Sequence, residues 1–176
     1  MIRHKKALSG VVTALLLVLL SVVLVGMVWA VIQNLVKNEL PEQECINAFE
    51  KVTLDSGLTC YLGGAGDTKE MQFSINVADM SVEKLLITIG GEGASKSVEI
   101  PSVSAVIADV KPYGAAYTYQ NAIVAPGKNS GLTYIYNLTA GGFTGAPTYV
   151  KVTPYIGGEA CSTSDQVTEI EACPLP

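Results

Sequence analysis

The residues of this chain that could support chemistry are few and lie far apart. The chain has four cysteines, an even number that is typical of disulfide-bonded proteins in oxidising compartments; they are Cys45, Cys60, Cys161 and Cys173. The only histidine is His4, so the rest of the chain cannot form a Ser-His-Asp triad, a Cys-His dyad or a histidine-rich metal site. The sequence therefore predicts no catalytic, cofactor-binding or metal-binding residue, and we expect a protein that is not an enzyme.

The charge distribution argues against nucleic acid as a partner. The net charge is -5 over 176 residues, and it becomes -8 when the three N-terminal cations Arg3, Lys5 and Lys6 are left out. Such an acidic surface repels phosphate backbones and anionic lipid headgroups. The aspartates are spread singly, without the spacing of a calcium-binding loop, and Gly63–Asp67 lacks the ending of a phosphate-binding loop. We expect these aspartates to be solvated charges.

The cysteine spacing favours two local disulfides, Cys45–Cys60 and Cys161–Cys173. Each pair closes a short loop, so the two thiols meet with little conformational search. Loop entropy assigns roughly 3 kcal/mol of stability to a disulfide that closes a loop of this size. Four cysteines allow two other connectivities, which the sequence leaves open.

One further modification site is the sequon Asn137-Leu138-Thr139, which can accept an N-linked glycan. The sequon comes at the end of an alternating segment, next to Gly141 and Gly142, and this position favours exposure. Asn137 is therefore a candidate glycosylation site, with a chance occurrence of the sequon as the alternative.

These residues follow a long apolar segment, because no charged side chain occurs between Ala7 and Val36. As a straight helix, residues 8–36 would be about 43 Å long, which exceeds the roughly 30 Å of bilayer hydrocarbon. The basic residues before it predict a cytoplasmic N-terminus and an external C-terminal domain. Polar residues follow, and Pro41 is predicted to end the helix.

Small residues inside this segment could let two helices approach closely. Gly10 pairs with Ala14, and Gly26 pairs with Ala30, each at the small-xxx-small spacing of packed membrane helices. A helix that only faces lipid also tolerates scattered small residues. The spacing is therefore compatible both with an assembly surface and with a simple anchor.

Three interpretations of the N-terminus compete. A secretory signal peptide would be cut after Ala30, an uncleaved signal anchor would keep the whole segment, and a third interpretation rests on Lys5-Lys6-Ala7 directly before Leu8. That junction resembles the class III signal peptide of archaeal type IV pilins, in which a prepilin peptidase cuts before the apolar helix. Bacterial pilins usually begin with Phe and have Glu at the fifth mature position. Leu8 and Val12 stand there in this chain, which favours the archaeal type.

Beyond residue 40, apolar residues recur at every second position, which predicts short antiparallel strands in a β-sandwich. A short helix over Pro41–Val52 is expected to precede them. The predicted strands are 72–77, 84–89, 97–100, 105–110, 122–124, 132–138 and 148–156, with turns at 63–67, 90–93 and 157–158. Tyr117/Tyr119 and Tyr134/Tyr136 each have the spacing of one strand face, where we expect them to pack.

Short sequence segments of this β region resemble the Ig-like head domains of archaeal pilins and archaellins. They are Phe73–Val77 followed by Leu85–Ile89, and Ala125-Pro126-Gly127. The combined resemblance implies an α+β protein with a cleaved basic leader (1–7), a transmembrane and filament-core helix (8–40) and an extracellular Ig-like β-sandwich head (41–176).

The same resemblance implies a function. The subunit would leave the membrane to join a helical homopolymer at the cell surface, with a prepilin peptidase, an assembly ATPase and a membrane platform protein as partners and adhesion as its role. No cofactor and no nucleic-acid partner are expected. The alternative is a monomeric, membrane-anchored extracellular binding or envelope protein, and a secreted enzyme would lack candidate residues.

Overall fold

The computed structural model describes residues 5–62, 70–92 and 94–174, and of residues 5–9 and 36–44 it describes only the backbone. The chain divides into two compact units, residues 1–40 and residues 41–176. The described residues confirm an α+β protein with one long apolar helix followed by mainly antiparallel sheets. The turn predicted at residues 63–67 lies outside the described part of the chain.

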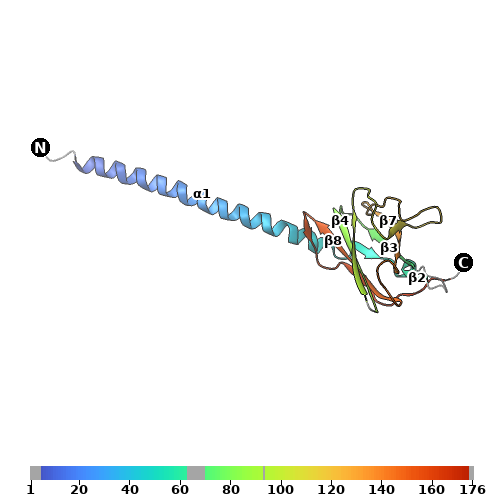
Figure 1. The fold of residues 1–176 in the computed structure, drawn as a ribbon. Helices are drawn as coiled ribbons and strands as arrows, with labels where there is room; N and C mark the ends of the chain where they lie inside the picture. Colours follow the sequence, from blue (N-terminus) through green and yellow to red (C-terminus); the bar gives the residue numbers. More distant parts are fainter. Residues whose placement is uncertain (1–4, 63–69, 93, 175–176) are drawn as a thin grey trace. The chain divides into compact units, whose positions relative to one another are not determined.

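The helix α1 runs from Lys5 to Ala48 and is the first element of the chain (Figure 1). The prediction that Pro41 ends it, with a separate short helix after it, is wrong. A proline removes one backbone hydrogen bond and costs about 3 kcal/mol inside a helix, but the good helix formers Glu, Gln and Ala follow it here. The end comes where Glu50 adopts a left-handed φ of 72° and the Lys51 N–H bonds to the Ala48 carbonyl oxygen at 3.1 Å.

Eleven strands and one short 3-10 helix are assigned in the described residues after α1. The strands are β1 (Val52–Leu54), β2 (Cys60–Leu62), β3 (Glu70–Val77), β4 (Lys84–Gly91), β5 (Ala94–Pro101), β6 (Val110–Pro112), β7 (Ser130–Asn137), β8 (Pro147–Ile156), β9 (Glu159–Ala160), β10 (Asp165–Val167) and β11 (Glu171–Ala172), and η1 is Ser56–Leu58. The strands predicted within β3, β4, β5, β7 and β8 are confirmed.

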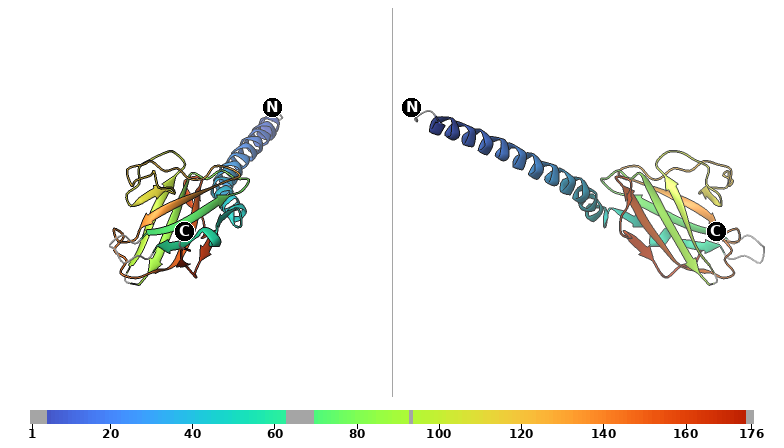
Figure 2. Two further views of the ribbon diagram at one scale, coloured as in Figure 1. Left: turned by 90° about the vertical axis from the view of Figure 1, so that its right-hand side faces the viewer. Right: turned by 60° about the vertical axis from the view of Figure 1, so that its left-hand side comes forward.

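These strands form two sheets, seen from two further sides in Figure 2. The first sheet has the order β11-β2-β3-β7-β6, with β1 also paired to β3. The second has the order β10-β8-β4-β5, with β9 also paired to β8. All of these pairings are antiparallel except that of β11 with β2, which is parallel.

Both sheets contribute to one hydrophobic core. Alternate side chains are buried along β3 and β4, such as Phe73 and Ile75 on β3 and Ile87 on β4. Burying one such side chain stabilises the fold by about 1.5–3 kcal/mol. The Tyr134 ring on β7 stacks on Phe73 with 5.4 Å between ring centroids. The predicted packing of Tyr134 and Tyr136 is confirmed, because both are buried.

Two strand predictions are wrong. Segments 105–110 and 122–124 meet only in a single bridge between Ala105 and Ile123, and β6 begins at Val110. From these segments, Ile107 and Ile123 pack on the core out of loops. Tyr117 and Tyr119 also lie in a loop, so they do not share a strand face, and the predicted packing of Tyr117 is wrong because its side chain is exposed. The turn prediction at residues 90–93 is also partly wrong, because Gly90 and Gly91 belong to β4. A Cβ at Gly90 would overlap the Tyr149 ring, so a larger residue at this position would displace that ring.

Candidate functional site

The largest exposed apolar surface lies on α1 between Gly10 and Leu35. This stretch of 26 residues is long and apolar enough to cross a membrane, and none of it is buried. Exposed valines and leucines occur at successive positions, so the apolar surface extends around the helix instead of forming one stripe. A helix that is apolar all round requires a buried or lipid environment. The segment therefore fits a membrane anchor or a signal sequence.

The small residues predicted for helix packing all lie on this exposed surface. Gly10, Ala14, Gly26 and Ala30 are exposed, and a Cβ built at either glycine meets no atom within 4 Å. The hydroxyl of Ser21 donates to the Val18 carbonyl oxygen at 2.7 Å, so this polar group is satisfied within the helix. The small positions are thus available for contact with another helix.

The predicted cleavage junction is described only in part. Met1–His4 lie outside the described residues, while Lys5, Lys6, Ala7 and Leu8 belong to the backbone of α1. Cleavage between Ala7 and Leu8 stays a prediction.

The disulfides differ from the predicted local pairing. Cys45 is bonded to Cys161, and Cys60 to Cys173, with Cα atoms 5.1 Å and 4.9 Å apart. The predicted pairs Cys45–Cys60 and Cys161–Cys173 are wrong because the sheets bring distant segments together. Strand β11 lies parallel to β2, with Glu171 opposite Cys60, and so delivers Cys173 to this edge of the first sheet. Two disulfides fit exposure to an oxidising, extracytoplasmic compartment.

Apolar side chains are also exposed beside the first disulfide. Ile46 is 73% and Phe49 is 59% exposed, and together with Cys45 and Ser162 they line an open groove of about 610 Å³. The second unit therefore carries its own exposed apolar surface, outside the segment Gly10–Leu35.

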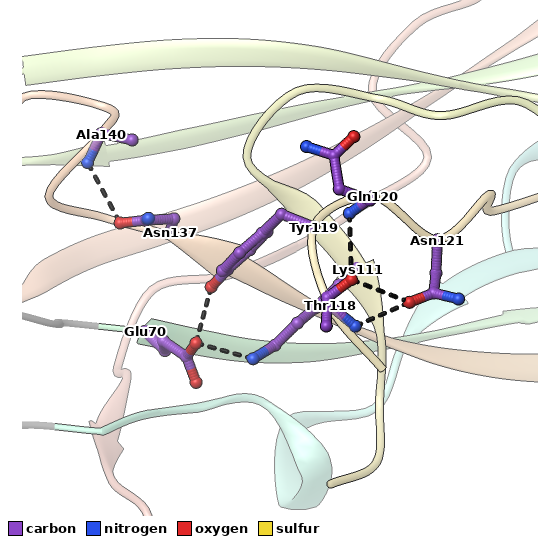
Figure 3. A network of polar contacts seen from close by, with 8 residues as sticks. All are labelled: Glu70, Lys111, Thr118, Tyr119, Gln120, Asn121, Asn137 and Ala140. Atoms are coloured by element: carbon purple, nitrogen blue, oxygen red, sulfur yellow. Dashed lines mark hydrogen bonds and ion pairs between the residues drawn. The ribbon is translucent and has the colours of Figure 1, made fainter. Parts of the chain in front are cut away.

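A polar network on the first sheet joins three segments of the head (Figure 3). The Glu70 Oε1 atom accepts hydrogen bonds from Lys111 Nζ at 2.8 Å and from the Tyr119 hydroxyl at 2.6 Å. Lys111 Nζ also lies 4.8 Å from the centroid of the Tyr119 ring. The network attaches the loop that carries Tyr119 to β3 and β6.

The electrostatics of this network stabilise the ionised Glu70. Burial acts to raise the pKa of Glu70, but the hydrogen bonds from Lys111 and Tyr119 and the charge of Lys111 outweigh it, so this pKa lies below its ordinary value of 4.5. Burial and the bond to Glu70 raise the pKa of the Tyr119 phenol. Sequence reasoning missed the network because Glu70, Lys111 and Tyr119 belong to no motif.

The loop is held by its own side chains as well. Asn121 Oδ1 accepts hydrogen bonds from the Thr118 N–H at 2.7 Å and from the Thr118 hydroxyl at 3.1 Å, and the Thr118 Oγ1 atom accepts from the Gln120 N–H at 3.3 Å. These bonds form a compact turn that presents Tyr119 to Glu70.

The sequon residue Asn137 is the last residue of β7 and is only half-buried, so it is less exposed than predicted. Its Oδ1 atom accepts a hydrogen bond from the Ala140 N–H at 3.1 Å. This bond occupies the oxygen and not the nitrogen to which a glycan would be attached. Its cross-strand neighbour on β3 is Glu70, so the sequon lies next to the polar network.

Two aspartates that the sequence assigned to solvent have structural roles. Asp55 Oδ1 accepts hydrogen bonds from the N–H groups of Gly57 and Leu58 and so caps η1. Asp165 Oδ2 accepts a hydrogen bond from the Leu54 N–H at 2.8 Å. Asp67 lies outside the described residues.

In comparisons with known proteins, no family model, no curated protein and no solved structure matches this chain. Within residues 5–62, 70–92 and 94–174, no three histidine, cysteine, aspartate or glutamate side chains gather in a group that could hold a metal ion.

Proposed function

We propose that this chain is the structural subunit of an adhesive, archaeal type IV pilus-like filament that assembles through α1 and carries an Ig-like β-sandwich head. One observation carries the proposal. The apolar segment Gly10–Leu35 is exposed on all sides, whereas the head buries its own core without it. A protein built in this way must bury the helix in lipid or against other copies of itself.

Both environments have a place in the proposed assembly. In the membrane, the segment spans the bilayer with its basic flank in the cytoplasm. In the filament, the same Val and Leu side chains exchange lipid contacts for contacts with neighbouring helices. Gly10, Ala14, Gly26 and Ala30 support this exchange, because small residues let helix backbones approach closely. Apolar surface kept from water contributes about 25 cal/mol per Å².

The leader supplies the second argument. Lys5, Lys6 and Ala7 directly precede Leu8, as in the precursors that a prepilin peptidase cuts. In this proposal cleavage leaves Leu8 as the first residue of the core helix, and an assembly ATPase with its membrane platform protein adds the subunit to the filament. The head then lies outside the cell, where its disulfides form and where Asn137 can receive a glycan.

Apolar side chains are also exposed outside the segment Gly10–Leu35, and this favours a filament subunit over a simple membrane anchor. Ile46 and Phe49 are exposed in the second unit, past the charged residues Lys37 and Glu39. A lipid anchor does not require apolar side chains at these positions. A filament subunit would use them, because packing against neighbouring copies covers them.

The alternative is a monomeric extracellular binding or envelope protein on an uncleaved signal anchor. The observation that favours it is the length of the segment Gly10–Leu35, about 39 Å as a helix, which is sufficient to span a bilayer without any further partner. This alternative predicts no processing and no filament.

N-terminal sequencing of the protein isolated from its native membrane and cell surface distinguishes these possibilities. The proposal expects Leu8 as the first residue and filaments under electron microscopy. An intact Met1 on a membrane-bound monomer would establish the anchor instead, and Val31 would indicate a secretory signal peptide. Replacement of Lys5 and Lys6 by Gln is expected to leave the precursor uncut, whereas the matched replacement of Lys37 by Gln leaves processing unchanged.

A further inference from the structure

The C-terminal segment from Cys161 to Cys173, here called the strap, runs from one sheet to the other. Near its start, β10 pairs with β8 of the second sheet, with Gln166 opposite Lys151. Near its end, β11 pairs with β2 of the first sheet. Each terminal residue of the strap is a disulfide-bonded cysteine, so both of its ends are covalently attached to the N-terminal part of the head.

The strap also binds the end of α1 and the strand that follows it. The hydroxyl of the buried Ser164 lies 2.9 Å from the Ala48 carbonyl oxygen and 2.8 Å from the Val52 carbonyl oxygen, so its single proton is shared between these two acceptors. Asp165 accepts the bond from the Leu54 N–H. Two successive strap residues therefore hold the junction at which α1 passes into β1.

This arrangement gives α1 two covalent routes into the head. One route is the chain itself, which enters the first sheet through the three residue pairs of β1 with β3. The other is the Cys45–Cys161 disulfide, which links α1 to the second sheet. Cys161 lies in the chain between β9 and β10, and both of these strands pair with β8. The Cys161 N–H also bonds to the Pro154 carbonyl oxygen of β8 at 2.9 Å.

We propose that the strap is a mechanical brace, in which the Cys45–Cys161 disulfide divides tension applied through α1 between the two sheets. Without it, only the hydrogen bonds of Ser164 and Asp165 and the three residue pairs of β1 with β3 oppose tension on α1, and these break one after another. With it, the same tension must also break the pairings of β9 and β10 with β8. The inference does not rest on the filament, because a membrane anchor also transmits force from α1 to the head.

The second disulfide provides a matched control. Cys60 and Cys173 join β2 to the far end of the strap, so this bond lies outside the route from α1 to β8. Its loop has a sequence separation of 113 residues, against 116 for Cys45–Cys161, so either bond restricts the unfolded chain to a similar extent. Their positions relative to α1 are different.

Single-molecule pulling of the full chain in detergent micelles tests the brace, with one handle at the N-terminus and one on an azide-bearing residue in place of the exposed loop residue Val103. We expect C45S/C161S to rupture first at a lower force than the wild type. That rupture should release the chain up to Cys60, which is roughly 15 residues or about 50 Å at about 3.4 Å per residue. C60S/C173S should keep the first rupture force of the wild type and lack this step.

Two results would overturn the brace: the same first rupture in C45S/C161S as in the wild type, or an equal loss of force in both double variants. A second measurement does not depend on the folding of C45S/C161S. In C60S/C173S the only disulfide left is Cys45–Cys161, so its reduction in the folded protein must lower the first rupture force and release at least about 50 Å of chain. An unchanged trace after reduction would contradict the proposal.

Discussion

The apolar segment of α1 and strand β4 are both rich in Leu, Ile and Val, yet their surroundings are opposite. Residues 10–35 of α1 are exposed throughout, whereas Leu85, Ile87 and Ile89 of β4 are completely buried. Along β4 from Lys84 to Ile89, buried side chains alternate with half-buried ones, so one face packs in the core between the two sheets and the other is only partly covered. In α1 the apolar residues are continuous, and no face of this segment is buried. Alternation thus predicts a partner within the chain, and continuity predicts one outside it.

The largest effect is expected when the segment without an internal partner is removed. A head fragment of residues 41–176 should fold as a soluble monomer, because every residue of its buried core lies within it. It should lose both membrane association and filament assembly. Size-exclusion chromatography under oxidising conditions, together with electron microscopy, measures this. Filaments formed by the fragment alone would show that α1 is not the assembly element.

Within the head, Ile87→Ala should remove about 2–5 kcal/mol from the free energy of unfolding, because it leaves a cavity between the two sheets. Leu86→Ala is the matched control, since the half-buried Leu86 points to the opposite face of β4. Its cost should be clearly smaller. Urea unfolding of both variants compares them, and equal losses would contradict the assignment of the two faces.

In α1, Gly26→Leu should prevent close helix approach and reduce or abolish filament formation. Membrane insertion should persist, because Leu partitions into the bilayer favourably. Val25→Leu is the control, as it changes an exposed neighbour without filling a small position. Cell fractionation measures insertion, and electron microscopy counts filaments. The same filament yield from both variants would remove the role proposed for the Gly26–Ala30 pair.

The smallest effect concerns the polar network, where Tyr119→Phe removes one hydrogen bond to Glu70 and should cost about 1 kcal/mol of stability. Because folding lowers the pKa of Glu70, its contribution is present above the ordinary value of 4.5 and is lost as the pH falls through the lower pKa of the folded state. The loss of folding stability between neutral and acidic pH should therefore be smaller in Tyr119→Phe than in the wild type. Urea unfolding between pH 7 and about pH 3 measures it, with Tyr113→Phe, an exposed tyrosine, as the control. An unchanged pH dependence in Tyr119→Phe would contradict this role.

The parts of the fold that follow from local patterns could be predicted from the sequence. Period-two alternation located β3, β4, β7 and β8, and the lack of charge from residue 8 to residue 36 located the apolar helix. Segments 105–109 and 122–124 have the same alternation, yet they meet only in the bridge between Ala105 and Ile123. Ile107 and Ile123 pack on the core from loops, and alternation alone does not distinguish this from a strand.

For the candidate site, the sequence by itself determined which segment needs a partner outside the chain, because a continuous apolar helix cannot be stable in water whatever follows it. It also determined where the small residues and the basic leader lie. Only the tertiary structure decided that Cys45 meets Cys161, that Cys60 meets Cys173, and that Glu70, Lys111 and Tyr119 form one network. Such contacts join residues far apart in the chain, and they depend on sheet order and register, which local periodicity does not encode.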